Sequence, residues 1–328
     1  MFCIGICDDD EGLCGELEKM LYDYGKEKMD SIRALGYEVE IIDEGRFTPE
    51  QVPYDSEVMC CYNPFDRLDI TKFPNLKLIQ LSSIGFDFIP KEDILNISIT
   101  LSNNRGGYSI PMGEWIVMNL LMLSRKAVKF WDNKKEKKWK LDSKLTELYG
   151  KTVTFLGTGT ISSEAAKRLQ GFEMNVVGVN TKGTDTLYFD KVYALEEVKT
   201  AIEQADYLVM VLPFTERTNH FLDKEKLSWM KNTAMLINVS RGNVIDEVAL
   251  TEALKSKTIA GAALDVFEEE PLSSESELWE MDNVFISPHN SWISEQRDNR
   301  RFNLIYENLK AYIKNKPLKN VVDIKRGY

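Results

Sequence analysis

Short apolar runs alternate with amphipathic stretches over the first hundred residues of the chain. Several of these runs are too short for helices, which predicts buried strands at residues 3–7, 37–42, 57–62, 76–81 and 97–101. Between the first two runs, residues 12–29 have the spacing of an amphipathic helix. Strands that alternate with helices predict a parallel sheet with helices on both faces.

A second alternating series begins at Lys151. A long helix is predicted before it at residues 110–130 and another at residues 295–313, and no linker rich in Gly, Pro or Ser is visible. The basic segment 134–140 is typical of a solvated, partly helical arm more often than of an anion-binding patch. Six strands, the number in a dinucleotide-binding sheet, are predicted at residues 153–156, 175–179, 207–212, 234–239, 259–264 and 284–287. The predicted fold class is therefore α/β, with two doubly wound parallel sheets.

The composition is that of an ordinary globular protein, and 328 residues are enough for two domains. The chain has 41 basic and 52 acidic residues, and its net charge of −11 argues against a nucleic-acid partner. No apolar run approaches the roughly 18 residues of a membrane span, and the acidic start does not fit a signal peptide. We therefore expect a cytoplasmic protein without a membrane partner.

The odd number of cysteines, all in the first fifth of the chain, argues against a disulfide framework. Their spacing matches no zinc pattern and no histidine lies near them, so no metal site is expected. Buried, reduced thiols are predicted at Cys3, Cys7, Cys14, Cys60 and Cys61.

A glycine turn connects the strand 153–156 to the next helix and predicts a phosphate-binding site. The order is Gly157-Thr158-Gly159-Thr160-Ile161-Ser162. Two glycines allow a tight turn and close approach of a pyrophosphate, and the helix N-terminus offers free backbone N–H groups. A third glycine is usual where Ser162 stands, but serine is small enough to keep the helix close to the sheet.

The residues that end the next strand bear on the choice of cofactor. A carboxylate there would bind the ribose 2′-hydroxyl of NAD(H), but this chain has Asn180-Thr181-Lys182. Lys182 could pair with a 2′-phosphate, whereas Asp185 lies further along the loop. The sequence thus favours NADP(H) and leaves NAD(H) open.

Three charged or titratable side chains follow successive predicted strands in the second half of the chain. Arg241 offers a planar, permanently charged fork for a carboxylate or a carbonyl oxygen. His289 can exchange a proton near neutral pH, and Glu270 could orient its imidazole. The other histidine, His220, is expected in a loop without comparable partners. The set predicts acid–base chemistry on a carbonyl group beside a carboxylate.

Together these motifs resemble those of the D-isomer-specific 2-hydroxyacid dehydrogenases, from about residue 31 to the C-terminus. The separations of Arg241, Glu270 and His289 along the chain also fit that family. The segments that carry the resemblance are residues 82–87, 111–115, 157–161, 212–213, 238–242, 261–267, 270–271 and 288–289.

The resemblance implies a Rossmann cofactor domain at residues 104–290, inserted in a flavodoxin-like substrate domain formed by residues 1–103 and 291–328. The long helices near residues 110 and 295 would connect the two domains, which accounts for the missing linker. The reaction would be hydride transfer between nicotinamide C4 and substrate C2. His289 would be the general acid/base, Glu270 its partner and Arg241 the substrate clamp.

The resemblance also implies which residues bind substrate and cofactor. The backbone at Ser83, Ile84 and Gly85 would hold the carboxylate of a small 2-oxo or 2-hydroxy acid, together with Arg241 and His289. The enzyme would be a homodimer joined through its cofactor domains. Asp265 would hold the nicotinamide carboxamide, and the other cofactor residues would be Gly157, Thr158, Gly159, Thr160, Ile161, Asn180, Thr181, Lys182, Leu212, Pro213, Val239 and Ser240.

The start of the chain departs from that family. Residues 2–28 resemble the first strand and helix of a response-regulator receiver domain, but segment 58–62 lacks the aspartate that a receiver needs. Both folds begin with the same strand–helix unit, so we expect this segment to complete the substrate domain.

Two alternatives stay open from the sequence. One is phosphoglycerate dehydrogenase-like activity, and the other is a non-catalytic nucleotide-sensing protein on this scaffold. The complete set of Arg241, Glu270 and His289 argues against the second alternative.

Overall fold

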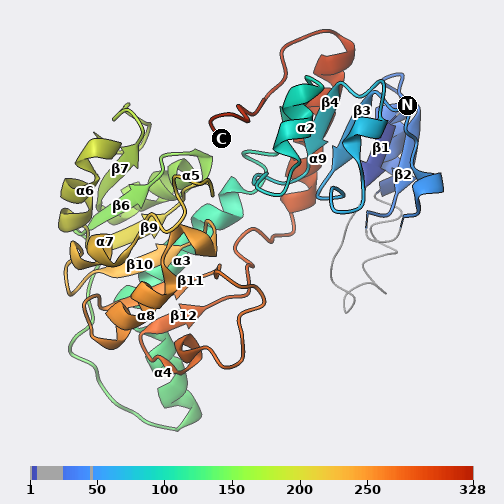
Figure 1. Ribbon diagram of the computed structural model, residues 1–328. Coiled ribbons are helices and arrows are strands. Elements are labelled where there is room, and N and C mark those ends of the chain that lie inside the picture. The colour runs from blue at the N-terminus through green and yellow to red at the C-terminus, as the bar shows by residue number, and fades with distance from the viewer. Residues whose placement is uncertain (1, 6–24, 45–46, 328) are drawn as a thin grey trace. The chain divides into compact units, whose positions relative to one another are not determined.

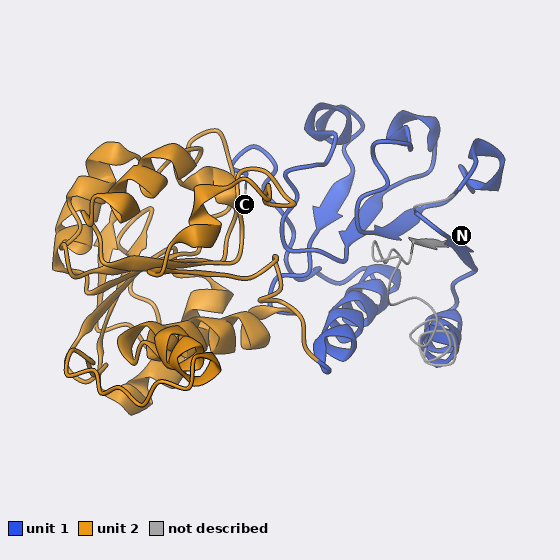
Figure 2. Ribbon diagram, turned by 90° about the horizontal axis from the view of Figure 1, so that it is seen from below, with its two compact units in different colours: residues 1–107, 295–328 blue, residues 108–294 orange. Residues whose placement is uncertain are grey.

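The computed structural model describes residues 2–5, 25–44 and 47–327. The chain divides into two compact units, which Figure 2 shows in different colours. Unit 1 contains residues 1–107 and 295–328, and unit 2 contains residues 108–294. Each unit has its own parallel sheet and its own hydrophobic cores.

Unit 1 is built on a five-stranded sheet in the order β2-β1-β3-β4-β5 (Figure 1). All of its pairings are parallel, and the order is that of a flavodoxin-like sheet. The five strands predicted from the sequence are confirmed with slightly different bounds: β1 (Phe2–Gly5), β2 (Val39–Ile42), β3 (Val58–Cys61), β4 (Leu78–Leu81) and β5 (Thr100–Ser102).

The first strand, β1, occupies an interior position in this sheet. Phe2 lies opposite Val39 of β2 on one side and opposite Val58 of β3 on the other. An interior strand bonds to both neighbours, so residues 2–5 are part of the sheet of unit 1. The rest of the receiver-like segment and the start of the helix predicted at 12–29 lie outside the described residues, while residues 25–33 are helical.

Helices cover both faces of the unit 1 sheet. Alternate residues of β3 point to opposite faces, so Met59 and Cys61 join one core while Val58 and Cys60 join the other. The first core is covered by α2 (Lys91–Asn96) and the 3₁₀ turns η1 (Pro49–Gln51) and η2 (Ile70–Lys72). The second is covered by the helical residues 25–33 and by α9 (Arg297–Ile313), which begins two residues later than predicted.

A buried polar group ties α9 to this sheet. Asn308 is fully buried, and its Nδ2 donates to Gln80 Oε1 at 2.7 Å and to Ser102 Oγ at 2.9 Å. Its Oδ1 accepts the backbone N–H of Lys319 at 2.8 Å. A buried amide whose groups are all bonded fixes the register of the helix on the sheet.

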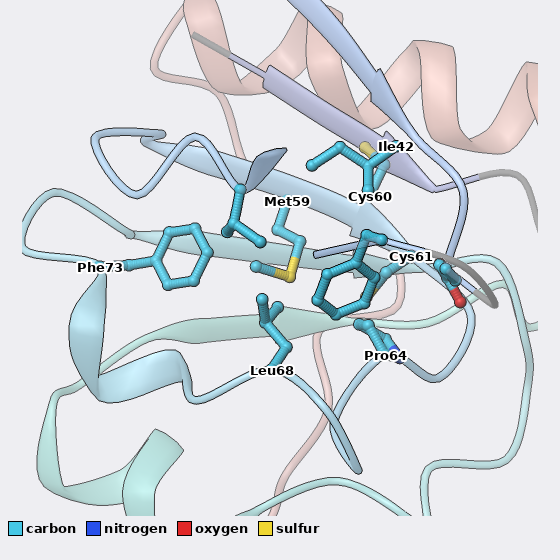
Figure 3. Close-up of a pocket in the computed structure, with 10 residues that line it drawn as sticks. Ile42, Met59, Cys60, Cys61, Pro64, Leu68 and Phe73 are labelled. Carbon is cyan, nitrogen blue, oxygen red and sulfur yellow. The ribbon is translucent and has the colours of Figure 1, made fainter. Parts of the chain in front are cut away.

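A small cavity of about 30 Å³ lies in the first core of unit 1. Figure 3 shows that Met59, Leu68 and Phe73 point toward one another around it. Its lining is mostly apolar, so it is a packing gap of that core. Cys60 and Cys61, which also line it, are buried and reduced, as predicted, whereas the side chains of Cys3, Cys7 and Cys14 lie outside the described residues.

Unit 2 contains a seven-stranded parallel sheet in the order β12-β11-β10-β9-β6-β7-β8. Counted from β6, this is the Rossmann order with one further strand at β12. The six predicted strands are confirmed, and β8 was missed because it is a short, partly exposed strand at the edge of the sheet. The bounds are β6 (Thr152–Leu156), β7 (Asn175–Asn180), β8 (Lys191–Ala194), β9 (Tyr207–Met210), β10 (Met235–Asn238), β11 (Gly261–Leu264) and β12 (Val284–Ile286).

Helices lie on both faces of this sheet, which Figure 2 shows nearly edge-on. One face is covered by α3 (Ser109–Ser124) and α5 (Thr160–Leu169), which pack closely at Gly113, where a Cβ would lie 3.0 Å from Ala165 N. The other helical elements are α4 (Ala127–Lys135), α6 (Val198–Gln204), α7 (Lys224–Ser228), α8 (Glu247–Lys255), η3 (Gln170–Phe172), η4 (Leu195–Glu197), η5 (Gly242–Val244) and η6 (Glu277–Glu280).

The single helix predicted at residues 110–130 is wrong. The chain forms two helices, α3 and α4, separated at Lys126, whose φ of +50° is left-handed and breaks the helical path. After α4, residues 136–140 are exposed, as predicted for a solvated, partly helical arm.

Candidate active site

The glycine turn after β6 has the geometry of a nucleotide-binding turn. Gly157 has a φ of +99°, and a Cβ there would lie 2.4 Å from Val211 O, so no other residue fits without strain. A Cβ on Gly159 would meet nothing within 4 Å, so the space beside the start of α5 is open. The first N–H groups of α5 have no partner within the helix and favour an anion. The turn therefore fits a pyrophosphate.

Ser162 takes the place of the usual third glycine without disturbing this turn. Its side chain is fully buried, and its Oγ donates to Gly157 O at 2.7 Å. The hydroxyl thus bonds to the turn itself, which satisfies a polar group that burial would otherwise penalise.

The loop after β7 is organised by Asn180. Its Nδ2 donates to Thr158 Oγ1 at 3.1 Å and to Thr184 O at 2.7 Å. Its Oδ1 accepts the N–H groups of Lys182 at 3.2 Å and of Thr184 at 3.0 Å. These bonds form an Asx turn that holds Thr181 and Lys182 beside the glycine turn. The side chain of Lys182 is exposed, and no described carboxylate pairs with its ammonium.

The other predicted cofactor residues follow neighbouring strands of the sheet. Leu212 and Pro213 come after β9, and Val239 and Ser240 come after β10. Asn238 lies in a segment that carries the resemblance but was given no role from the sequence; its Oδ1 accepts both the N–H of Ser240 at 3.0 Å and its hydroxyl at 2.8 Å. Sheets of this kind bind ligands at the carboxyl ends of their strands, and contact of these residues with cofactor stays a prediction.

The two side chains predicted for acid–base chemistry contact each other. His289 Nδ1 lies 2.7 Å from Glu270 Oε2, and Glu270 Oε1 accepts the N–H of Phe267 at 3.0 Å. Burial opposes ionisation of Glu270, but its bond to His289 and the charges of His289 and Arg241 outweigh that effect. The pKa of Glu270 is therefore lowered from its ordinary value. Because Nδ1 is used by Glu270, Nε2 of His289 is left for a substrate.

The backbone of His289 is fixed from several sides. Its φ is +51°, in the left-handed region, and its N–H donates to Asp265 O at 2.8 Å and to Ser287 O at 3.1 Å. Its carbonyl accepts the indole N–H of Trp292 at 2.7 Å, and that ring packs edge-on against Tyr108. A non-glycine residue held in this conformation is a feature that clusters at functional sites.

Asp265 holds the turn that carries His289. Its fully buried carboxylate accepts the hydroxyl of Ser287 at 2.5 Å and the N–H groups of Asn290 at 2.8 Å and Ser291 at 3.0 Å. The sequence did not indicate this task, because it depends on contacts between separate loops. A role toward the nicotinamide carboxamide stays a prediction.

Arg241 follows β10 in an extended conformation, with a φ of −144°. Its charge acts on Glu270. Next to it, a Cβ on Gly242 would lie 1.8 Å from the backbone carbon of Phe267, so the loops that carry Arg241 and Glu270 touch through their backbones. The structure therefore brings the three predicted catalytic residues together within unit 2.

The predicted carboxylate site lies in unit 1, directly after β4. Ser83 Oγ donates to Gly85 O at 2.8 Å, and Asn103 Nδ2 donates to Ile84 O at 2.9 Å, so side chains fix the carbonyls of this turn. Within the described part of the chain, the N–H groups of Ser83, Ile84 and Gly85 have no acceptor. Successive unpaired N–H groups form a concave site for an anion.

The expectation that His220 lacks a comparable partner is wrong. Its Nε2 lies 2.8 Å from Glu268 Oε1, and its N–H donates to Asn243 O at 2.7 Å. Glu268 belongs to the same acidic run as Glu270, so the sequence contained the partner but not the loop contact that brings it to His220.

Among the residues that the structure describes, no helix is long and apolar enough to span a membrane. The described residues also contain no cluster of three or more His, Cys, Asp or Glu side chains that could hold a metal ion.

The chain is similar to known proteins of one enzyme family. Residues 117–291 match the family model for the NAD-binding domain of D-isomer specific 2-hydroxyacid dehydrogenases. A glyoxylate reductase of Korarchaeum cryptofilum is 30% identical over 276 residues, 82% of each protein. A D-3-phosphoglycerate dehydrogenase of Methanocaldococcus jannaschii is 31% identical over 263 residues, 78% of this chain and 49% of that protein.

A solved structure extends the likeness to the whole chain. The D-isomer specific 2-hydroxyacid dehydrogenase from Xanthobacter autotrophicus, in complex with NADPH and MES, has a TM-score of 0.80 and 27% identity, with 99% of both chains covered. The chain therefore belongs to the D-isomer specific 2-hydroxyacid dehydrogenase family, as an NAD(P)-dependent oxidoreductase that acts on the CH–OH group of 2-hydroxy acids.

Proposed function

We propose that this enzyme uses NADP(H) to interconvert small 2-oxo acids and D-2-hydroxy acids, with His289 as the general acid/base. The observation that carries the proposal is the contact of His289 Nδ1 with Glu270 Oε2 at 2.7 Å, within reach of the charge of Arg241. An imidazole held at one nitrogen by a carboxylate presents the other nitrogen in a fixed direction.

Each residue has a defined task in the proposed reaction. During reduction, His289 gives the proton on Nε2 to the carbonyl oxygen at C2, and it takes that proton back during oxidation. Glu270 fixes the tautomer and orientation of the ring, and Arg241 binds the oxygen that becomes negative. In unit 1, the N–H groups of residues 83–85 hold the substrate carboxylate. The glycine turn would hold the cofactor, which would supply or accept the hydride at C2 when bound.

The NADP(H) assignment rests on the loop after β7. No carboxylate stands at residues 180–182, the ammonium of Lys182 is exposed, and the relative from Xanthobacter autotrophicus was solved with NADPH. In the Lys182→Ala variant the KM for NADPH should rise about tenfold, because a charge-assisted bond to the 2′-phosphate is lost, while the KM for NADH stays nearly constant. Lys167→Ala, which removes an exposed lysine of α5, is the matched control. A wild type that prefers NADH would contradict the assignment.

The substrate class is tested with glyoxylate and a series of larger 2-oxo acids, each with NADPH and NADH. We expect saturable oxidation of NADPH with at least one small 2-oxo acid. Wild-type protein that binds nucleotide but turns over none of them would favour the sensing alternative and overturn the proposal.

A phosphoglycerate dehydrogenase-like activity is the second candidate, because the Methanocaldococcus jannaschii relative bears that name. It is tested by the oxidation of 3-phosphoglycerate with each nicotinamide cofactor. A higher kcat/KM for this compound than for any unphosphorylated 2-hydroxy acid would replace the first candidate.

We also propose a cytoplasmic homodimer joined through unit 2. The arm after α4 exposes Trp139 completely and Leu141 almost completely, and Trp131 of α4 is 59% exposed. Large apolar side chains exposed together mark a protein interface. Sedimentation should show a dimer that the double variant Trp139→Ser/Leu141→Ser converts to monomer, and a monomeric wild type would contradict the proposal.

A further inference from the structure

The loop that carries Glu270 also supplies the glutamate of a second histidine–glutamate pair. His220 Nε2 lies 2.8 Å from Glu268 Oε1, and the same oxygen accepts the N–H of Glu247 at 3.1 Å. In return, Glu247 Oε2 accepts the N–H of Glu268 at 3.0 Å. The loop of residues 266–271 is thus tied by three contacts to residues outside it.

Glu247 is a firm anchor because it is the first residue of α8. The N-cap residue Asp246 accepts the N–H of Ala249 at 2.9 Å, and α8 buries Leu250 and Leu254 in the core of unit 2. A carboxylate at a helix N-terminus also interacts favourably with the helix dipole. Glu268 therefore sets the position of its loop relative to a helix that belongs to the core.

His220 is itself held in place. Its φ is +47°, and its backbone N–H donates to the carbonyl oxygen of Asn243 at 2.7 Å. Asn243 lies two residues after Arg241. Leu222 continues the pairing by donating to Val244 O at 3.0 Å. The backbone of His220 is therefore bonded to the loop of Arg241, and its imidazole reaches Glu268 on the loop of Glu270.

We propose that Glu268, held by His220 and Glu247, is a positioning residue that keeps Glu270 in contact with His289. It acts through Glu270, because Phe267 N–H, one residue before Glu268, is the group that bonds to Glu270 Oε1 at 3.0 Å. A shift of residues 267–268 therefore moves the partner of His289. This inference rests on the proposed acid–base role of His289.

The first test compares three variants of adjacent residues. Glu268→Ala should lower kcat about tenfold or more with little change in the KM for NADPH, because a small misplacement of a catalytic group is costly. Glu268→Gln should recover most of the activity, since its oxygen can still accept from Glu247 and His220. Glu269→Ala, which removes an exposed carboxylate of the same run, should match the wild type.

A double-mutant cycle separates positioning from general stability. If Glu268 acts through Glu270, Glu268→Ala should cost almost nothing further in a Glu270→Gln background, whereas a purely structural role would give additive losses. Should Glu268→Ala fail to fold, His220→Asn serves in the same cycle, because asparagine tolerates the positive φ and leaves the contact with Glu247 intact.

The outcomes of these tests are distinct. The positioning role alone is refuted if the wild type turns over 2-oxo acids and Glu268→Ala either has the same kcat or shows additive losses in the cycle. Wild type without turnover refutes the acid–base function of His289 and the positioning role with it.

Discussion

The two histidines of the chain form two similar pairs with one acidic run. His289 lies 2.7 Å from Glu270, and His220 lies 2.8 Å from Glu268. The side chains are also similarly exposed, 39% and 35% in the first pair and 45% and 30% in the second. Distance and exposure therefore do not distinguish the pairs.

The surroundings of the pairs differ. Glu270 faces the charge of Arg241, and its pKa is lowered. Glu268 faces a second carboxylate, Glu247. Burial and the charges of Glu268 and Glu269 raise the pKa of Glu247, although its bond to the Glu268 backbone lowers it. A histidine–glutamate contact thus becomes a candidate for catalysis when a cation and the end of a sheet strand accompany it.

We expect the largest difference in kcat between the variants His289→Asn and His220→Asn. Both histidines have a positive φ, which asparagine tolerates, so both variants should fold. Loss of a general acid/base should lower kcat roughly a thousandfold in His289→Asn. In His220→Asn the loss should be about tenfold or less, since the Glu247 contact still holds Glu268. Equal losses, measured as kcat with one 2-oxo acid, would show that the pairs are not functionally different.

The next effect concerns Gly242, where the loops of the two pairs meet. In Gly242→Ala the new Cβ would overlap the backbone of Phe267, so both loops must move. We expect the free energy of unfolding to fall by about 2 kcal/mol, with a loss of kcat. Gly171→Ala is the control, because a Cβ there meets nothing within 4 Å. If chemical denaturation finds both variants equally stable, the two loops are not in tight backbone contact at Gly242.

The sequence was sufficient to predict those features that depend on residue type and on position along a strand. Gly157 follows an apolar strand and needs a positive φ, and Arg241 and His289 follow later strands at which such sheets bind ligands. The order of both sheets also followed from alternating strands and helices together with the resemblance to a family. These features depend on local pattern and on topology, which the chain encodes directly.

The features that the sequence could not supply depend on contacts between distant loops or on weak local signals. The bonds of Asp265 to Asn290 and Ser291, like the contact of His220 with Glu268, exist only once separate loops meet. The helix break at Lys126 was missed because apolar residues continue on both sides of it.

The smallest expected effect is the pH dependence of stability, in which Glu270 of the first pair and Glu247, the carboxylate beside the second pair, should differ in sign. The folded-state pKa of Glu270 is lowered, so its ionised form stabilises the fold above the unfolded pKa of about 4.3. That contribution is lost as the pH falls through the lower folded value. The pKa of Glu247 is raised, so its ionised form costs stability near neutral pH, and protonation in acid removes the cost.

Glutamine variants measure the two contributions separately. At pH 7, Glu270→Gln should lower the free energy of unfolding by less than about 1 kcal/mol, because solvent screens a carboxyl that is a third exposed. Glu247→Gln should raise it slightly, since the amide oxygen can still accept the N–H of Glu268 without the charge. Urea denaturation from pH 7 to pH 3 should show both differences shrinking in acid. Changes of the same sign at pH 7 would mean that the surroundings of the two pairs are electrostatically alike, and the catalytic assignment would then rest on Arg241 and strand position alone.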